Sequence, residues 1–134
     1  MRKNESQTYR GGCHCGQVAF EATGTIEDVS ECNCSICRKK GYVHWIIPRE
    51  SFRLLTPVEN IATYTFNTGV AQHYFCARCG IASFYIPRSD PDKIDVNLRC
   101  LDGINLSDFT LRKFDGQNWE SSIGEFHERR SGKK

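Results

Sequence analysis

The sequence predicts a small, mainly β domain of short antiparallel sheets that are pinned together by cysteines. Three observations predict this fold class. The chain has 134 residues, which favours one domain, because two separate cores would each be too small to fold. Its apolar residues alternate with polar ones more often than they follow a helical period. Eight residues are cysteines, and most of them stand close together in the sequence.

The alternating runs predict the strands. They lie at 18–22, 61–66 and 94–98. The short polar stretch between 61–66 and 70–75 contains a glycine, which predicts a hairpin whose second strand ends at Cys76. Residues 81–86 would return as a further strand. The core of the fold is therefore expected to be sheet throughout.

The remaining segments complete a single domain over residues 1–134. One helical turn is expected at 35–40, whereas 104–114 follows neither the strand period nor the helix period. We expect an ordered core over about residues 9–126 and a basic tail at 127–134.

Composition excludes several classes of protein. Hydrophobic residues make up 39% and charged residues 25% of the chain, with a mean hydropathy of -0.51, which fits neither a disordered nor a membrane protein. The polar residues 1–10 lack the apolar core of a secretory signal, so we expect a cytoplasmic protein that does not bind membranes. The net charge of +2 comes from mixed signs, which argues against nucleic acid as a partner.

The cysteine spacing points to metal rather than to disulfides, because thiols in a reducing cytosol more often bind metal than pair. Seven of the eight form a C-x-C, a C-x-C-x-x-C and a C-x-x-C motif: Cys13 and Cys15; Cys32, Cys34 and Cys37; Cys76 and Cys79. Thiolates at such spacings suit tetrahedral zinc. Iron–sulfur proteins use different spacings. We therefore expect Zn²⁺.

Seven cysteines cannot complete two four-cysteine sites, so one site has three. The four-cysteine group, which would hold a structural zinc, consists of Cys13, Cys15, Cys76 and Cys79. The three-cysteine group, which keeps a coordination position open as catalytic zinc does, consists of Cys32, Cys34 and Cys37. Gly16 and Gly80 follow the two pairs of the first group and allow the chain to turn with positive φ. In the alternative partition, Cys100 completes the second site; otherwise Cys100 is a buried apolar thiol.

The three cysteine motifs resemble those of a known protein family. GGCHCGQVAF at 11–20, CNCSICRKKG at 32–41 and FCARCG at 75–80 resemble the glutathione-dependent formaldehyde-activating enzyme family, which includes centromere protein V. The resemblance implies an Mss4-like fold of antiparallel sheets and the same partition into a structural and a catalytic zinc. It also implies condensation of glutathione and formaldehyde to S-hydroxymethylglutathione, formally a carbon–sulfur lyase reaction. Ser35 and Arg38 stand where members known for that reaction carry Thr and Trp.

A zinc with three thiolates favours sulfur chemistry. It carries a formal charge of about -1 and is a poorer Lewis acid than zinc held by neutral histidines. We expect a small thiol such as glutathione to bind as the thiolate and to form or break a carbon–sulfur bond. Arg38 follows the last cysteine and is expected to hold a substrate carboxylate, while Lys39 and Lys40 are expected to be solvated.

Four histidines could transfer the proton. His44 ranks ahead of His73, because it follows the three-cysteine group most closely. His14 is expected to point away from the metal, and His127 lies in the tail. Three aromatic residues could line a pocket, although core positions are commoner for such residues: Tyr42, Trp45 and Phe84.

Two other functions fit the cysteines. The chain could be a non-catalytic zinc module that binds a protein, in which both zinc ions are inert. Alternatively, the three-cysteine group could be a redox or sulfur-carrier cluster without metal, which predicts one zinc and several reactive thiols.

Overall fold

The computed structural model describes residues 6–66, 69–120 and 122–124, and the tail expected at 127–134 lies outside them. The described chain is mainly β, as predicted. Its strands are β1 (Gln7–Gly12), β2 (Ala19–Gly24), β3 (Ser30–Cys32), β4 (Val43–Pro48), β5 (Phe52–Leu54), β6 (Ile61–Tyr64), β7 (Gln72–Cys76), β8 (Phe84–Ile86), β9 (Lys93–Asn97) and β10 (Arg112–Phe114).

The helices are short. One α-helical turn, α1, spans Cys37–Lys40, within the segment where the sequence predicts a turn of helix. Short 3-10 helices lie at Arg49–Ser51, Val58–Asn60, Leu98–Cys100, Leu106–Asp108 and Gly116–Asn118. In the part of the chain that the structure describes, no helix has the length and apolar character needed to cross a membrane.

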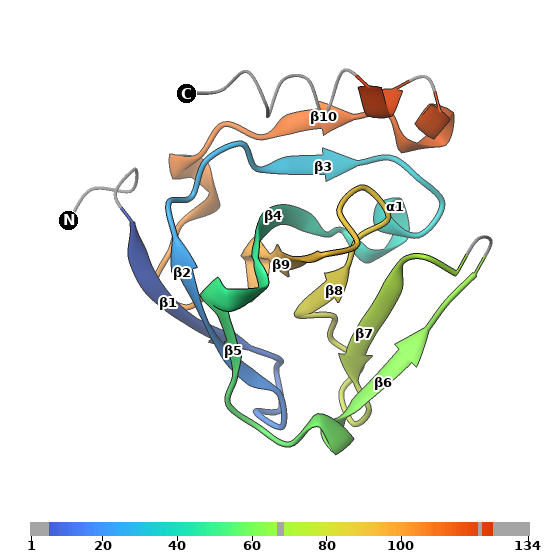
Figure 1. Cartoon of the computed structure of the whole chain (residues 1–134). Coiled ribbons are helices and arrows are strands. Elements are labelled where there is room, and N and C mark those ends of the chain that lie inside the picture. Colours follow the sequence, from blue (N-terminus) through green and yellow to red (C-terminus); the bar gives the residue numbers. More distant parts are fainter. Residues whose placement is uncertain (1–5, 67–68, 121, 125–134) are drawn as a thin grey trace.

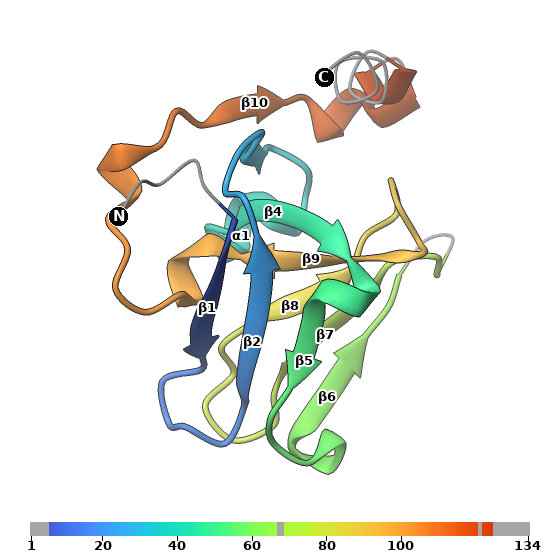
Figure 2. The same cartoon turned by 60° about the vertical axis from the view of Figure 1, so that its left-hand side comes forward.

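The strands form two sheets (Figures 1 and 2). The smaller has the order β1-β2-β5, and the larger has the order β10-β3-β4-β9-β8-β7-β6. Every pairing between these strands is antiparallel except that of β3 with β10, which is parallel. Phe20 of β2, Phe52 of β5 and Phe84 of β8 meet between the sheets, with ring centroids 4.6 to 6.3 Å apart. The main core therefore lies where the two sheets face each other.

The predicted hairpin is confirmed. β6 and β7 pair in antiparallel register from Ile61 opposite Cys76 to Tyr64 opposite His73. The strand expected at 81–86 is shorter than predicted and begins at Phe84. The reason is that the backbone N–H of Cys76 donates to the carbonyl of Ile81 at 3.0 Å, which closes a turn around the second cysteine pair.

Candidate functional site

The four-cysteine group lies where the two sheets are joined at one end. Its four sulfurs all lie within 4.8 Å of one another. The Sγ atom of Cys15 is 3.7 Å from that of Cys13 and 3.6 Å from that of Cys76. Gly16 and Gly80 have φ angles of 88° and 82°, which confirms the turns expected after the two pairs. The group thus connects the β1–β2 turn to the end of β7.

The three-cysteine group lies between β3 and α1. The sulfurs of Cys32, Cys34 and Cys37 are also within 4.8 Å of one another, and no His, Cys, Asp or Glu elsewhere in the described residues joins them as a fourth member. The backbone N–H of Cys37, the first residue of α1, points at Cys34 Sγ at 3.4 Å. This set of donors could hold a metal ion and leaves one tetrahedral position for another ligand.

Cys100 belongs to neither group. Its Sγ atom faces the carbonyl of Ala82 at 3.8 Å. Burial raises the pKa of the Cys100 thiol, and the charges of Cys13 and Cys79 add to this effect. Cys100 therefore lies on the side of the four-cysteine group and not beside the three-cysteine group.

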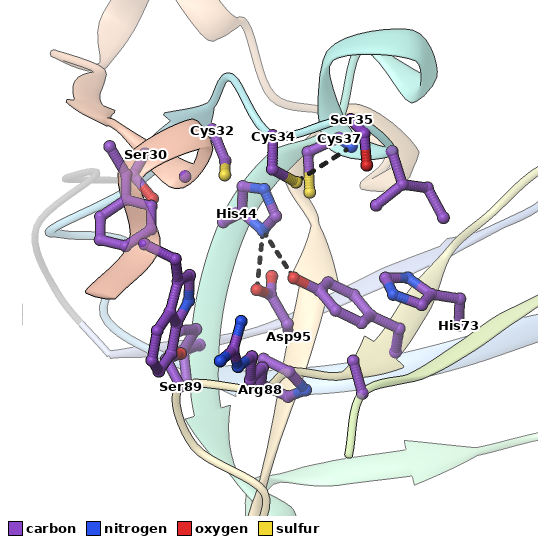
Figure 3. Close-up of a pocket in the computed structure, with 18 of the residues that line it drawn as sticks. Ser30, Cys32, Cys34, Ser35, Cys37, His44, His73, Arg88, Ser89 and Asp95 are labelled. Carbon is purple, nitrogen blue, oxygen red and sulfur yellow. Dashed lines mark hydrogen bonds and ion pairs between the residues drawn. The ribbon is translucent and has the colours of Figure 1, made fainter. Parts of the chain in front are cut away.

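A cavity of about 410 Å³ adjoins the three-cysteine group (Figure 3). The three sulfurs line it together with His44, Asp95 and Arg88. Its outer wall comes from the segment after β10, including Gly116 and Trp119. A small molecule in this cavity would therefore touch both the sulfurs and the polar groups opposite them.

His44 and Asp95 form a buried pair in this cavity, with exposed fractions of 6% and 1%. The Nδ1 atom of His44 is 2.7 Å from Asp95 Oδ2 and 3.4 Å from Tyr85 Oη. A carboxylate at Nδ1 favours the proton there, which leaves Nε2 as the acceptor. Nε2 is buried and has no hydrogen-bond partner among the described residues. In Figure 3 this edge of the ring is turned toward the sulfurs.

Asp95 was not identified as a site residue from the sequence. The alternation over 94–98 places it on the polar face of β9, but the residues Ile94 to Asn97 are all buried. The reason is that β9 lies inside the sheet, between β4 and β8. Its second face is covered by Tyr42, whose hydroxyl donates to the backbone carbonyl of Asp95. Because β9 alternates apolar and polar residues, nothing in the sequence distinguished Asp95 from a solvent-facing residue of a half-buried strand.

Lys40 and His73 form a second contact near the cavity. Lys40 Nζ is 3.1 Å from His73 Nδ1 and lies 5.3 and 5.0 Å from the ring centres of Tyr42 and Tyr85. Burial lowers the pKa of Lys40. Burial, followed by the charge of Lys40, lowers the pKa of His73 to about 4. Lys40 is thus half-buried against aromatic rings, whereas the sequence interpretation had it solvated.

The two arginines differ in their placement. Arg38 is exposed on α1 and is not among the residues that line the cavity, so its expected contact with a substrate carboxylate stays a prediction. Arg88, which follows β8, does line the cavity. Nothing in its sequence context, a turn between two prolines, indicated this position.

The other candidates lie elsewhere. His14 is exposed, and His127 falls outside the described residues. Trp45 and Phe84 belong to the main core, and Tyr42 is buried behind the cavity. None of these three aromatic residues lines the cavity beside the three-cysteine group.

This chain is similar to known proteins over most of its length. The model of the family described as "Glutathione-dependent formaldehyde-activating enzyme" matches residues 8–114. A crystal structure of a Rhodobacter sphaeroides protein, a structural genomics target, is similar with a TM-score of 0.69 and 34% identity; the match covers 75% of this chain and 99% of that one. The matched range includes both cysteine groups, His44 and Asp95. The chain belongs to the glutathione-dependent formaldehyde-activating enzyme family.

Proposed function

We propose that this protein is a zinc-dependent carbon–sulfur lyase that acts on an adduct of glutathione or another small thiol, in the manner of an S-(hydroxymethyl)glutathione synthase. The observation that carries the proposal is the three-cysteine group lining a cavity of about 410 Å³, with no fourth protein ligand among the described residues. The family to which the chain belongs supports a reaction that involves glutathione.

The donor atoms suit two zinc ions per chain. Four sulfurs at about 2.3 Å from a tetrahedral zinc would be about 3.8 Å apart. In the four-cysteine group, Cys15 Sγ lies 3.7 and 3.6 Å from the Sγ atoms of Cys13 and Cys76. We assign a structural zinc to this group and a catalytic zinc to Cys32, Cys34 and Cys37. A zinc bound by the three-cysteine group would take the substrate sulfur as its fourth ligand and favour the thiolate form.

His44 is the residue to which we assign proton transfer. In the synthetic direction, the thiol loses its proton, its sulfur bonds to the carbonyl carbon, and the carbonyl π bond breaks. His44 Nε2 accepts that proton and delivers it to the new hydroxymethyl oxygen, so the proton count balances. Asp95 Oδ2, at 2.7 Å from Nδ1, positions the ring for this transfer.

The test is the rate at which the protein interconverts free formaldehyde and glutathione with their adduct. Exchange NMR on zinc-loaded protein should show an exchange rate above the spontaneous one. The substitution His44→Gln should reduce the added rate by a factor of about 100, the usual scale of general acid–base catalysis. His14→Gln is the matched control, because His14 is exposed, and it should keep the rate. An exchange rate equal to the spontaneous one in the zinc-loaded wild type would refute the proposal for this substrate.

A further inference from the structure

The segment after β10 forms the outer wall of the cavity and is fixed there by specific contacts. Asn33, between the first two cysteines of the three-cysteine group, donates from its Nδ2 to Asp115 Oδ1 at 3.0 Å. Gln117 donates from its backbone N–H to Asn33 Oδ1 and from its side chain to the Asn33 carbonyl, at 3.0 and 2.9 Å. A Cβ atom at Gly116 would clash with Cys32 Sγ. The wall therefore lies in direct contact with the cysteine loop.

Beyond this contact the wall reaches Arg88. The guanidinium carbon of Arg88 lies 3.8 Å from the ring centre of Trp119, and its Nη2 atom donates to Glu120 Oε2 at 3.1 Å. Stacking on an aromatic face leaves the N–H groups at the edge of the guanidinium available for other acceptors. Trp119 thus orients the Arg88 guanidinium. Glu120 accepts from only one of the Arg88 nitrogen atoms, Nη2.

The charges around the cavity make Arg88 the place where an anionic group of a ligand would bind. Among the described residues that line the cavity, Arg88 is the only Arg or Lys. Asp95 lines the same cavity and is buried, and the three cysteine sulfurs lie there as well. A carboxylate entering this cavity is repelled near Asp95 and attracted at Arg88, so Arg88 sets both its place and its orientation.

Glu120 already presents a carboxylate to Arg88. Its side chain is 87% exposed and that of Arg88 is 35% exposed. An ion pair this accessible to solvent contributes little to stability, so a carboxylate that is also held inside the cavity can replace it. Trp119 and Glu120 both lie beyond residue 114, where the match to the family model ends.

We infer that Arg88, oriented by Trp119, binds a carboxylate of the substrate, and that Glu120 competes with that carboxylate for the same guanidinium. The inference rests on the proposed function, because it takes the cavity beside the three-cysteine group to be the substrate site. It names the substrate class as small thiols, or their adducts, that carry a carboxylate. Selectivity against uncharged thiols then depends on a segment outside the family match.

The experiment measures binding rather than turnover. The probes are S-methylglutathione, whose sulfur has no proton to lose, and its dimethyl ester, which lacks both carboxylates. Calorimetric titration of the zinc-loaded full chain should show that the acid binds at least about tenfold more tightly than the ester, the effect of a charge-assisted hydrogen bond. Arg88→Gln should abolish this preference. Arg53→Gln, an exposed arginine on β5 that does not line the cavity, is the matched control and should keep it.

The variant Glu120→Gln tests the competition without risk to the fold, because the side chain is exposed. It should bind S-methylglutathione a few-fold more tightly and the ester as wild type does. Equal affinities of wild type for acid and ester, or an undiminished preference in Arg88→Gln, would overturn the inference. Neither probe is turned over, so these results stand apart from any failure of the lyase assay.

Discussion

His73 shows how a single buried residue makes stability depend on pH. Its ring is stacked between Phe66 and Tyr85, at centroid distances of 5.5 and 4.8 Å, and contacts Lys40 Nζ. Burial and the Lys40 charge lower its pKa from 6.5 to about 4. The unfolded chain therefore binds a proton at this residue at a higher pH than the folded chain does. Acidification from about pH 6.5 to about pH 4 must then favour unfolding.

The substitution His73→Phe should reduce this acid sensitivity. Phenylalanine keeps a ring between Phe66 and Tyr85 but cannot bind a proton. We expect the loss of unfolding free energy between about pH 7.5 and about pH 5 to be smaller in the variant than in wild type. Above about pH 7, removing the titrating group should not increase the unfolding free energy. Urea unfolding at the two pH values measures it. Identical losses in the two proteins would show that His73 does not contribute to the pH dependence.

At the scale of elements, the packing of the Gly116–Asn118 helix against the cysteine loop is the contact on which the site depends. β10 runs parallel to β3, from Arg112 opposite Ser30 to Phe114 opposite Cys32. The chain then has to pass over the sulfur of Cys32, and only a residue without a side chain fits there. Any side chain at residue 116 would therefore disturb the three-cysteine group.

Gly116→Ala should weaken metal binding at the three-cysteine group, because the added methyl group would clash with Cys32 Sγ and lie 2.8 Å from Cys34 Cβ. We expect one zinc per chain to become removable at a chelator concentration at least about tenfold lower than in wild type, the other staying bound. Gly124→Ala is the matched control, since a Cβ there meets no atom within 4 Å. Unchanged chelator resistance in Gly116→Ala would contradict the proposed closeness of wall and metal site.

For the whole molecule, the two cysteine groups have different consequences. The four-cysteine group joins the turn after β1, in the three-stranded sheet, to the end of β7, in the seven-stranded sheet. The three-cysteine group lies within one short stretch next to α1. Metal at the first group would thus connect the two sheets across the core, whereas metal at the second would order only a loop.

This difference predicts the outcome of two matched substitutions. Cys76→Ser should unfold the chain, since structural zinc contributes on the order of 10 kcal/mol to folding. Cys37→Ser should keep the circular dichroism spectrum and one zinc while abolishing turnover. Metal analysis of wild type should give two zinc ions, one of which exchanges readily. Two inert ions would favour the non-catalytic zinc module, and one ion with several alkylatable thiols would favour the redox cluster.

The sequence determined the features that depend on residues close together in the chain. Alternation of apolar and polar residues identified the β6–β7 hairpin and the central strand β9. The spacing of the cysteines predicted the two groups of sulfurs that the structure contains. The glycine after each outer pair indicated a positive φ. Local spacing is sufficient for these because sulfurs one or two residues apart can converge on one point without long-range packing.

Only the tertiary structure decided the rest. β1 has almost no apolar residues, and its extended form comes from its pairing with β2. The pairing of His44 with Asp95 depends on the register of β4 against β9, which is set by the packing of both faces of the sheet. Arg88 and Trp119 meet because the chain returns across the cavity after β10. Such contacts join residues about 30 to 50 positions apart, and only the folded chain fixes their distance.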